Sequence, residues 1–348
     1  MRAVTIAGRR ISTQDPPYVV AELSANHNGD IGRAFEIMQA AKAAGADAVK
    51  LQTYTPDTMT IDAPQEEFQI RGGLWDGYSL YDLYKEAQTP WEWHAPLFAK
   101  GRELGLTVFS TPFDESAVDL LEELGAPAYK IASFEAIDLA LIARCARTRK
   151  PMIISTGMAN LGEIQEAVDT ARSNGARELI VLHCISAYPA PATDANLRTI
   201  PHMADAFDVV TGLSDHTLGT TVAAAAVALG AAFIEKHVTM RRSDGGPDSA
   251  FSLEPAELGE LVRGCRTAWE AVGNITYARE VSEEKNVAFR RSLYIVKDVR
   301  AGEAFTSENV RAIRPGYGLP PKYLPEVLGR TARRDLPRGT RLTWDALE

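Results

Sequence analysis

Eight short runs of β-branched and other apolar residues recur before residue 240. Most are nearly continuous in apolar character rather than alternating, which is typical of strands buried on both faces of a parallel sheet. They therefore predict an α/β protein. The predicted strands are Tyr18–Leu23, Ala48–Thr53, Thr107–Thr111, Ala128–Ser133, Met152–Thr156, Leu179–Ser186, Val209–Ser214 and Phe233–Thr239.

Segments with apolar residues at helical spacing lie between these runs, and most are followed by a glycine that can cap the helix. This repeated order of strand, helix and glycine predicts a closed (β/α)8 TIM barrel. A doubly wound open sheet is the alternative, which the lack of a Gly-x-Gly-x-x-Gly motif after the first strand disfavours. The predicted helices are Ile31–Ala44, Trp91–Leu104, Ser116–Leu124, Leu161–Ser173, Thr220–Leu229 and Glu254–Val272.

Three further segments stand outside this repeat. The runs Val4–Ile6 and Arg10–Ser12 are compatible with a hairpin that plugs the barrel floor. The stretch from Pro56 to Thr89 is long for a connection between strand and helix. It contains Trp75, Tyr78, Tyr81 and Tyr84, and we interpret it as an active-site lid or a subunit contact.

The repeat breaks after Gly273. We therefore expect a barrel domain over residues 1–273, a linker over 274–290 and a compact domain of short strands over 291–348. The strands expected in the last domain are Ser292–Val296, Val310–Ile313 and Thr340–Trp344.

Composition narrows the functional classes. The chain has 348 residues, more than one barrel of roughly 250 residues needs, and 45% of them are hydrophobic. The net charge of −9 argues against nucleic acid as a partner. No apolar run approaches the roughly 20 residues of a membrane span. Three widely spaced cysteines, Cys145, Cys184 and Cys265, are typical of reduced thiols, so we expect a cytoplasmic protein without membrane contact.

Polar residues end all eight predicted strands, at the rim where such barrels carry their active sites. A single serine there is usually a turn residue. Lys50 and Lys130, however, lie inside apolar strands, and buried lysines are rare unless paired. Two lysines among several hydroxyls predict a site for an anion such as phosphate or carboxylate.

His216 and His237 follow each other at the ends of strands seven and eight. Histidines in a core are the plain alternative, but imidazole is also the commonest metal-ligating side chain. With Glu22 on the neighbouring first strand, the pair predicts a catalytic metal site with open positions. These ligand types do not distinguish Mn²⁺, Zn²⁺ and Fe²⁺. The glycine-containing segment 243–248, otherwise a surface turn, brings Asp248 within reach of a substrate.

Taken together, these motifs resemble the sialic acid synthase family over nearly the whole chain. They include Glu22-Leu-Ser-Ala-Asn-His-Asn-Gly29, Gly212-Leu-Ser-Asp-His216 and Glu235-Lys-His237. Arg314-Pro-Gly-Tyr-Gly318 resembles the motif of the family's C-terminal antifreeze-like (SAF) domain. Ser186-Ala-Tyr-Pro189 and Tyr317 make pseudaminic acid synthases the most similar subfamily.

The resemblance implies a reaction. Phosphoenolpyruvate condenses with 2,4-diacetamido-2,4,6-trideoxy-β-L-altropyranose and water to give pseudaminic acid and phosphate. An N-acetylneuraminate or legionaminate synthase with the same mechanism is the alternative. A metal-dependent aldolase or sugar hydrolase that does not use phosphoenolpyruvate would explain the histidines but would give Lys50 and Lys130 no function. A stand-alone binding module would leave the decorated strand ends unexplained.

The resemblance also implies roles for individual residues. Glu22 is expected beside the reacting carbons, and His216 and His237 hold a divalent metal, most often Mn²⁺, with Mg²⁺ or Co²⁺ as alternatives. Arg314 is expected to reach the site from the small domain, in its own subunit or across a domain-swapped homodimer. The residues expected to bind the two substrates are Lys50, Gln52, Thr111, Phe113, Lys130, Ser133, Ser155, Ser186, Tyr188, Ser214, Asp248 and Arg314.

Overall fold

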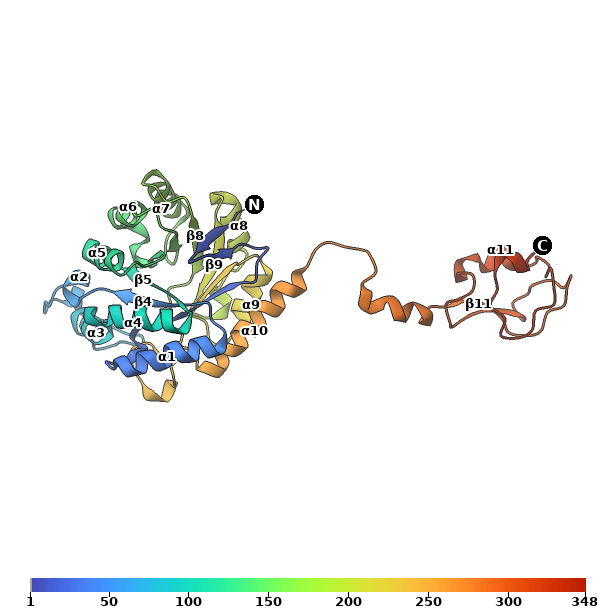
Figure 1. Cartoon of the computed structure of the whole chain (residues 1–348), viewed down its shortest axis with the longest axis horizontal. Coiled ribbons are helices and arrows are strands. Elements are labelled where there is room, and N and C mark those ends of the chain that lie inside the picture. The colour runs from blue at the N-terminus through green and yellow to red at the C-terminus, as the bar shows by residue number, and fades with distance from the viewer. Residues whose placement is uncertain (1) are drawn as a thin grey trace. The chain divides into compact units, whose positions relative to one another are not determined.

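The computed structural model describes residues 2–348, which fold as two compact units, residues 2–273 and 274–348. In the first unit, eight parallel strands close into a barrel (Figure 1). The ring closes where β10 pairs with β3, which sets His237 opposite Glu22. The strands are β3 (Tyr18–Glu22), β4 (Ala48–Thr53), β5 (Thr107–Pro112), β6 (Tyr129–Ile131), β7 (Met152–Ser155), β8 (Leu179–Cys184), β9 (Val210–Asp215) and β10 (Phe233–His237). The predicted (β/α)8 barrel is confirmed, and the open sheet is excluded.

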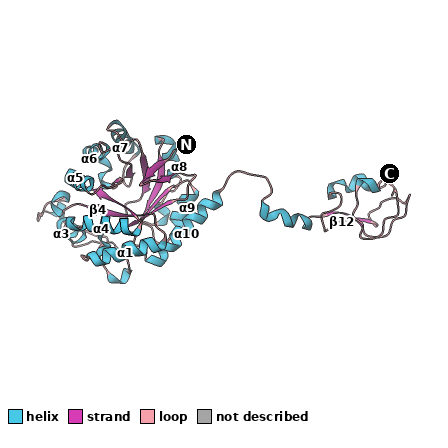
Figure 2. Cartoon of the chain, in the orientation of Figure 1, coloured by secondary structure: helices cyan, strands magenta, loops and turns pink. Residues whose placement is uncertain are grey.

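At least one helix follows each strand and packs outside the barrel, as the helices around the central strands in Figure 2 show. Two of them, α6 and α8, were not predicted from the sequence, because no glycine follows their last residues. Arg147 follows α6, and Asp208 after α8 takes the left-handed conformation itself, with φ of 50°. The helices are α1 (Ile31–Ala44), α4 (Trp91–Leu104), α5 (Glu115–Glu123), α6 (Leu139–Ala146), α7 (Leu161–Ser173), α8 (Thr199–Phe207), α9 (Thr221–Ala228) and α10 (Pro255–Val272).

The barrel interior is apolar at its lower end. Tyr18 and Phe233 stack there with ring centroids 5.5 Å apart. The hairpin of β1 (Val4–Ile6) and β2 (Arg9–Ile11) adds its buried side chains to the same cluster. The hairpin therefore closes the floor, as predicted, and polar chemistry is left to the opposite rim.

The insertion after β4 carries α2 (Pro56–Met59), a 3-10 turn (Glu66–Phe68) and α3 (Leu80–Ala87). The second unit begins with a 3-10 helix (Val281–Phe289) and pairs β11 (Ser292–Ile295) with β12 (Val310–Ile313) beside the short α11 (Leu324–Val327).

The expected strand at Thr340–Trp344 is wrong. That segment makes only an isolated bridge, between Arg341 and Tyr294, because its backbone bonds to β11 only through Thr340 and Leu342. It then turns into a 3-10 helix at Trp344–Ala346. Within residues 2–348, no helix is long and apolar enough to cross a membrane.

Candidate active site

Four charged side chains from four strands meet inside the rim. Lys50 on β4 lies 2.8 Å from the Glu22 carboxylate on β3. Lys130 on β6 lies 2.9 Å from Glu235 on β10, and Lys50 is 3.7 Å from the same Glu235 oxygen. All four side chains are buried. Two positive and two negative charges thus balance each other in a region where a lone charge would be costly.

The two carboxyl groups differ in their electrostatic surroundings. Burial raises the pKa of Glu22 by more than Lys50 lowers it. Burial also opposes ionisation of Glu235, but Lys130 and Lys50 outweigh it and hold the pKa of Glu235 below its ordinary value. Glu235 is therefore held as an anion, and Glu22 is the carboxyl of the two that takes up a proton more readily.

Hydroxyl groups surround the lysines. Thr111 accepts a hydrogen bond from Lys50 at 3.1 Å, and Ser214 donates to Glu235 at 3.1 Å. The Ser155 hydroxyl is buried and has no hydrogen-bond partner. These groups supply donors beside the two ammonium groups, which suits an anionic ligand.

Gly157 brings two further hydroxyls close to the backbone of the loop after β7. Its amide donates to Ser133 at 3.2 Å. A Cβ at this position would lie 2.1 Å from the Ser186 hydroxyl and 2.8 Å from that of Ser133, so a larger residue would displace them. Serines from two strand-end loops therefore meet around a glycine of a third.

The two histidines lie side by side, with ring centroids 5.4 Å apart. His216 donates through Nδ1 to the Ile185 carbonyl at 2.9 Å, which leaves its Nε2 lone pair available. Burial, with His216 as the next cause, keeps the pKa of His237 well below its ordinary value, and its Nδ1 is buried without a hydrogen-bond partner. Two imidazoles with uncommitted nitrogens fit a divalent metal ion.

Proton and metal would compete for His216. Burial lowers its pKa, but its contacts with Cys184 and the Ile185 carbonyl outweigh burial and raise it. Glu22 is directed to Lys50 and Gln52 instead of completing a triad with the histidines. Among residues 2–348, no three His, Cys, Asp or Glu side chains form a group that could hold a metal. A metal at this position would thus have two protein ligands among the described residues, the imidazoles of His216 and His237.

Gln52 connects Glu22 to Ser24 and Asp248 in the neighbouring loops. Its amide donates to Glu22 at 3.1 Å and to Ser24 at 2.8 Å. Ser24 in turn donates to Asp248 at 2.5 Å, and Asp248 lies 3.6 Å from His237 Nδ1. Tyr188 covers His216 at a ring distance of 4.4 Å. These side chains form a polar network bordered by an aromatic ring.

Two expected residues lie further out. Phe113 packs edge-on against Tyr54, with ring centroids 5.2 Å apart, in the loop after β5. Arg314 is exposed on the second unit, in the loop after β12. The other expected residues all lie at the rim of the barrel.

Three residues of the site were missed in the sequence. Glu135 has a buried carboxylate oxygen without a partner, and burial raises its pKa to about 7. It follows Ser133 by two positions in a 3-10 turn, which looks like an ordinary surface segment. Ser24 and Phe251 are buried beside Gln52 and His237. Ser24 lies inside the motif that starts at Glu22, and this position was the one signal for it in the sequence.

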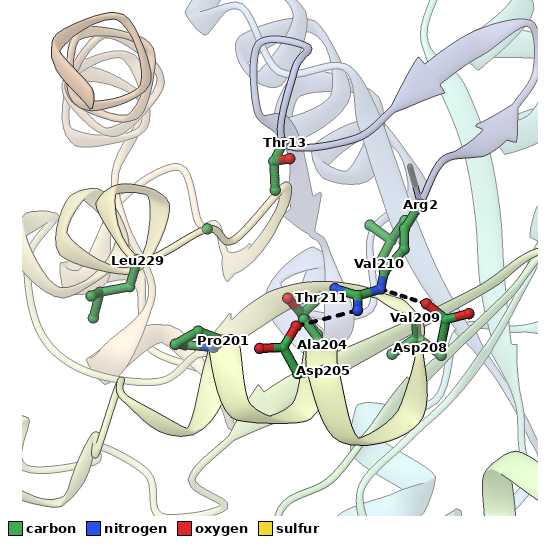
Figure 3. A pocket seen from close by; sticks show the side chains of 11 residues that line it. Arg2, Thr13, Pro201, Ala204, Asp205, Asp208, Val209, Val210, Thr211 and Leu229 are labelled. Carbon is green, nitrogen blue, oxygen red and sulfur yellow. Dashed lines mark hydrogen bonds and ion pairs between the residues drawn. The ribbon is translucent and has the colours of Figure 1, made fainter. Parts of the chain in front are cut away.

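A separate hollow of about 470 Å³ lies at the opposite end of the barrel (Figure 3). Arg2 crosses it and pairs with Asp205 at 3.2 Å and with Asp208 at 2.8 Å. Thr211 at the start of β9 and Gly230 before β10 also line it. Because these are amino-terminal strand ends, the hollow is distinct from the candidate site.

Comparisons with known proteins agree with this geometry. The pseudaminic acid synthase of Helicobacter pylori is 45% identical over 334 residues, which cover 96% of this chain and 98% of that protein. The N,N'-diacetyllegionaminic acid synthase of Legionella pneumophila is 36% identical over 95% of this chain and 94% of that protein. The crystal structure of an N-acetylneuraminic acid synthetase from Leptospira borgpetersenii in complex with citrate is 29% identical, with a TM-score of 0.74 over 82% of this chain and 95% of that one.

Two family models also match, and together they span most of the sequence. The NeuB family model matches residues 37–277, and the SAF domain model matches residues 290–348. The first match alone covers more than half of the chain, and the resemblance to sialic acid synthases is thereby confirmed. The chain is an enzyme of the NeuB family that carries a C-terminal SAF domain.

Proposed function

We propose that this enzyme is a pseudaminic acid synthase. It condenses phosphoenolpyruvate with 2,4-diacetamido-2,4,6-trideoxy-β-L-altropyranose and water to give pseudaminic acid and phosphate. One observation carries the reaction class: two buried lysines and a set of hydroxyls lie beside two neighbouring histidines. The 45% identity to the Helicobacter pylori pseudaminic acid synthase supports the choice of sugar.

Phosphoenolpyruvate carries a carboxylate and a phosphate, which need several cationic and neutral donors. Lys50 and Lys130 supply the charge, and the unpartnered Ser155 hydroxyl supplies a free donor. The serines around Gly157 form a cradle for one of the anionic groups. The residues that bind this substrate are Lys50, Thr111, Lys130, Ser133, Ser155, Ser186 and Ser214.

His216 and His237 would hold a divalent metal, Mn²⁺ in our assignment, with Mg²⁺ or Co²⁺ as alternatives. When bound, the metal supplies Lewis-acid polarisation of the sugar aldehyde oxygen. The hydrogen bond from His216 to Ile185 fixes the ring so that Nε2 faces away from the backbone carbonyl. Burial keeps His237 neutral, as ligation requires.

The protein's own groups then guide the carbon chemistry. The enol C3 attacks the aldehyde carbon, and positive charge develops at C2, next to the Glu22 carboxyl. Water adds to C2 and transfers its proton to Glu22, which Lys50 and Gln52 hold in place. The tetrahedral intermediate then loses phosphate by cleavage of the bond between C2 and its oxygen, and the proton of its C2 hydroxyl leaves with the phosphate. The proton that Glu22 took up balances the one that the former aldehyde oxygen gains. Glu235 stays ionised and favours the protonated form of both lysines. The pKa of Lys50 is raised, whereas burial outweighs Glu235 at Lys130 and lowers its pKa.

The sugar lies against Gln52, Phe113, Tyr188 and Asp248, and Arg314 reaches the site from the partner subunit of a domain-swapped homodimer. Exposed apolar residues on the second unit support such an assembly. Ile275, Tyr277, Val281 and Phe289 all lie more than half exposed before β11, and apolar groups gathered on one segment usually mark an interface. We place the enzyme in the cytoplasm, consistent with three free cysteines among the described residues.

Phosphate release tests the proposal directly. Purified enzyme with Mn²⁺ and phosphoenolpyruvate should release phosphate with the diacetamido altropyranose and much less with N-acetylmannosamine or the legionaminate precursor. In ¹⁸O-labelled water the label should enter C2 of the product and not the phosphate, because the C–O bond breaks. Phosphate release only with N-acetylmannosamine would refute the pseudaminate assignment, and label in the phosphate would refute the mechanism.

A further inference from the structure

The insertion after β4 presents one aromatic side chain to the barrel rim. Its loop from Gln69 to Ser79 is closed by an antiparallel bridge between these two residues and by a hydrogen bond from Ile70 N to Tyr78 O at 2.9 Å. Trp75 near the tip is partly buried, whereas Leu74 beside it is 45% exposed. The loop therefore holds Trp75 against the barrel and leaves its neighbours in solvent.

Trp75 contacts the two loops that carry residues of the sugar side. Its indole N–H donates to the Pro247 carbonyl at 2.9 Å, immediately before Asp248. Its ring lies 5.5 Å from that of Tyr188, in the loop after β8. One side chain thus joins the insertion to the loops after β8 and β10.

The aromatic surface continues from Trp75 toward the histidines. Tyr188 lies 5.2 Å from Phe251 and 4.4 Å from His216, and Phe251 lies 5.0 Å from His237. Trp75, Tyr188 and Phe251 therefore form a wall that begins at the proposed metal ligands and ends at the indole. A sugar whose aldehyde oxygen reaches the histidines extends along this wall.

We propose that Trp75 determines the specificity of the enzyme for an amino sugar rich in methyl groups. This inference rests on the proposed function. Compared with N-acetylmannosamine, the diacetamido substrate has an acetamido group in place of the C4 hydroxyl and a methyl in place of the C6 hydroxymethyl. Both changes remove a hydroxyl and add a methyl group, as part of the amide at C4 and alone at C6, and an aromatic wall binds methyl groups better than hydrated hydroxyls. A contact of this size changes kcat/KM by roughly 10- to 200-fold.

Substitution of Trp75 separates the wall from a general role in folding. Trp75→Ala should lower kcat/KM for the diacetamido sugar by roughly 10- to 100-fold and leave KM for phosphoenolpyruvate unchanged. Its kcat/KM for N-acetylmannosamine should change much less, so the ratio of the two kcat/KM values, which measures the preference for the diacetamido sugar, should fall. Trp75→Phe keeps a ring without the N–H group and should retain most of the preference. Leu74→Ala, one residue away in solvent, is the matched control.

The outcomes distinguish this inference from the proposed function. Equal losses for both sugars in Trp75→Ala, or a rise in KM for phosphoenolpyruvate of the same size, overturn the role in specificity while the proposed function stands. A wild-type enzyme that prefers N-acetylmannosamine overturns both. A narrowed preference with unchanged KM for phosphoenolpyruvate and an unchanged melting temperature supports the inference.

Discussion

Lys130 donates a hydrogen bond to Glu235 at 2.9 Å across the barrel, although 105 residues separate them in the sequence. Both side chains are about 3% exposed. Removal of one partner would leave the other as an uncompensated buried charge, which costs about 3–5 kcal/mol. The pair therefore couples the stability of the barrel to its anion-binding chemistry.

A double-mutant cycle should reveal this coupling. Glu235→Ala alone should lower the free energy of unfolding by about 3–5 kcal/mol, and adding Lys130→Met should recover part of that loss. Denaturant titrations measure both effects. The exposed pair Lys297 and Glu308, 2.9 Å apart, is the control and should contribute less than about 1 kcal/mol. Simple additivity of the two single losses would contradict a direct interaction.

Lys130 should also be required for phosphoenolpyruvate binding. In Lys130→Met a charge-assisted contact with the substrate is lost, which costs about 2–4 kcal/mol, or roughly 30- to 1000-fold in kcat/KM for phosphoenolpyruvate. Steady-state kinetics at saturating sugar give this value. Lys42→Met, where the native ammonium bonds to the Gly105 carbonyl on the surface, should behave as wild type. An unchanged KM for phosphoenolpyruvate in Lys130→Met would place the anion elsewhere.

Removal of either histidine should abolish tight metal binding. His216→Ala and His237→Ala each delete one of two proposed protein ligands. Loss of a group that only supports a metal ligand weakens metal affinity by roughly 10- to 100-fold, so loss of a ligand itself should weaken the affinity for Mn²⁺ by at least about 100-fold. Isothermal titration calorimetry measures this without turnover. His202→Ala on the exposed face of α8 is the control. Variants that kept wild-type affinity would show that the metal lies at another site.

The barrel was predictable because the sequence marks each strand with an apolar run and marks the carboxyl end of the strand with polar residues. The partners of the lysines were less visible. Glu235 appears as a polar residue on the last strand, and only closure of the ring brings it to Lys130. Glu135 could not be found, because the burial of a carboxyl in a 3-10 turn depends on packing that no local pattern records.

Glu135 should make stability depend on pH. Burial raises its pKa from 4.5 to about 7, so the folded state binds its proton more tightly than the unfolded chain does. Its contribution is fully present below about pH 4.5 and is lost as the pH rises through 7, by an amount on the order of 3 kcal/mol. Glu135→Gln should therefore gain stability relative to wild type between pH 5 and pH 8. Denaturant titrations at several pH values test this.

A matched substitution controls for the loss of a carboxyl as such. Glu123→Gln on the exposed side of α5 should give a stability curve parallel to that of wild type across this pH range. If Glu135→Gln also runs parallel to wild type, the carboxyl of Glu135 is not stabilised in its protonated form by folding.

Arg314 offers a test of the proposed exchange of small domains between subunits. Arg314→Ala should lose most activity because a charged contact to substrate disappears, at about 2–4 kcal/mol. His237→Ala should be inactive as well. When both variants are co-expressed, a swapped heterodimer contains one site with both defects and one site with neither. Because random assembly makes about half of the dimers heterodimers, activity should recover to about a quarter of the wild-type value. If Arg314 serves its own subunit, every site keeps one defect and the mixture stays inactive. The exposed Arg311→Ala, combined with His237→Ala in the same way, controls for expression.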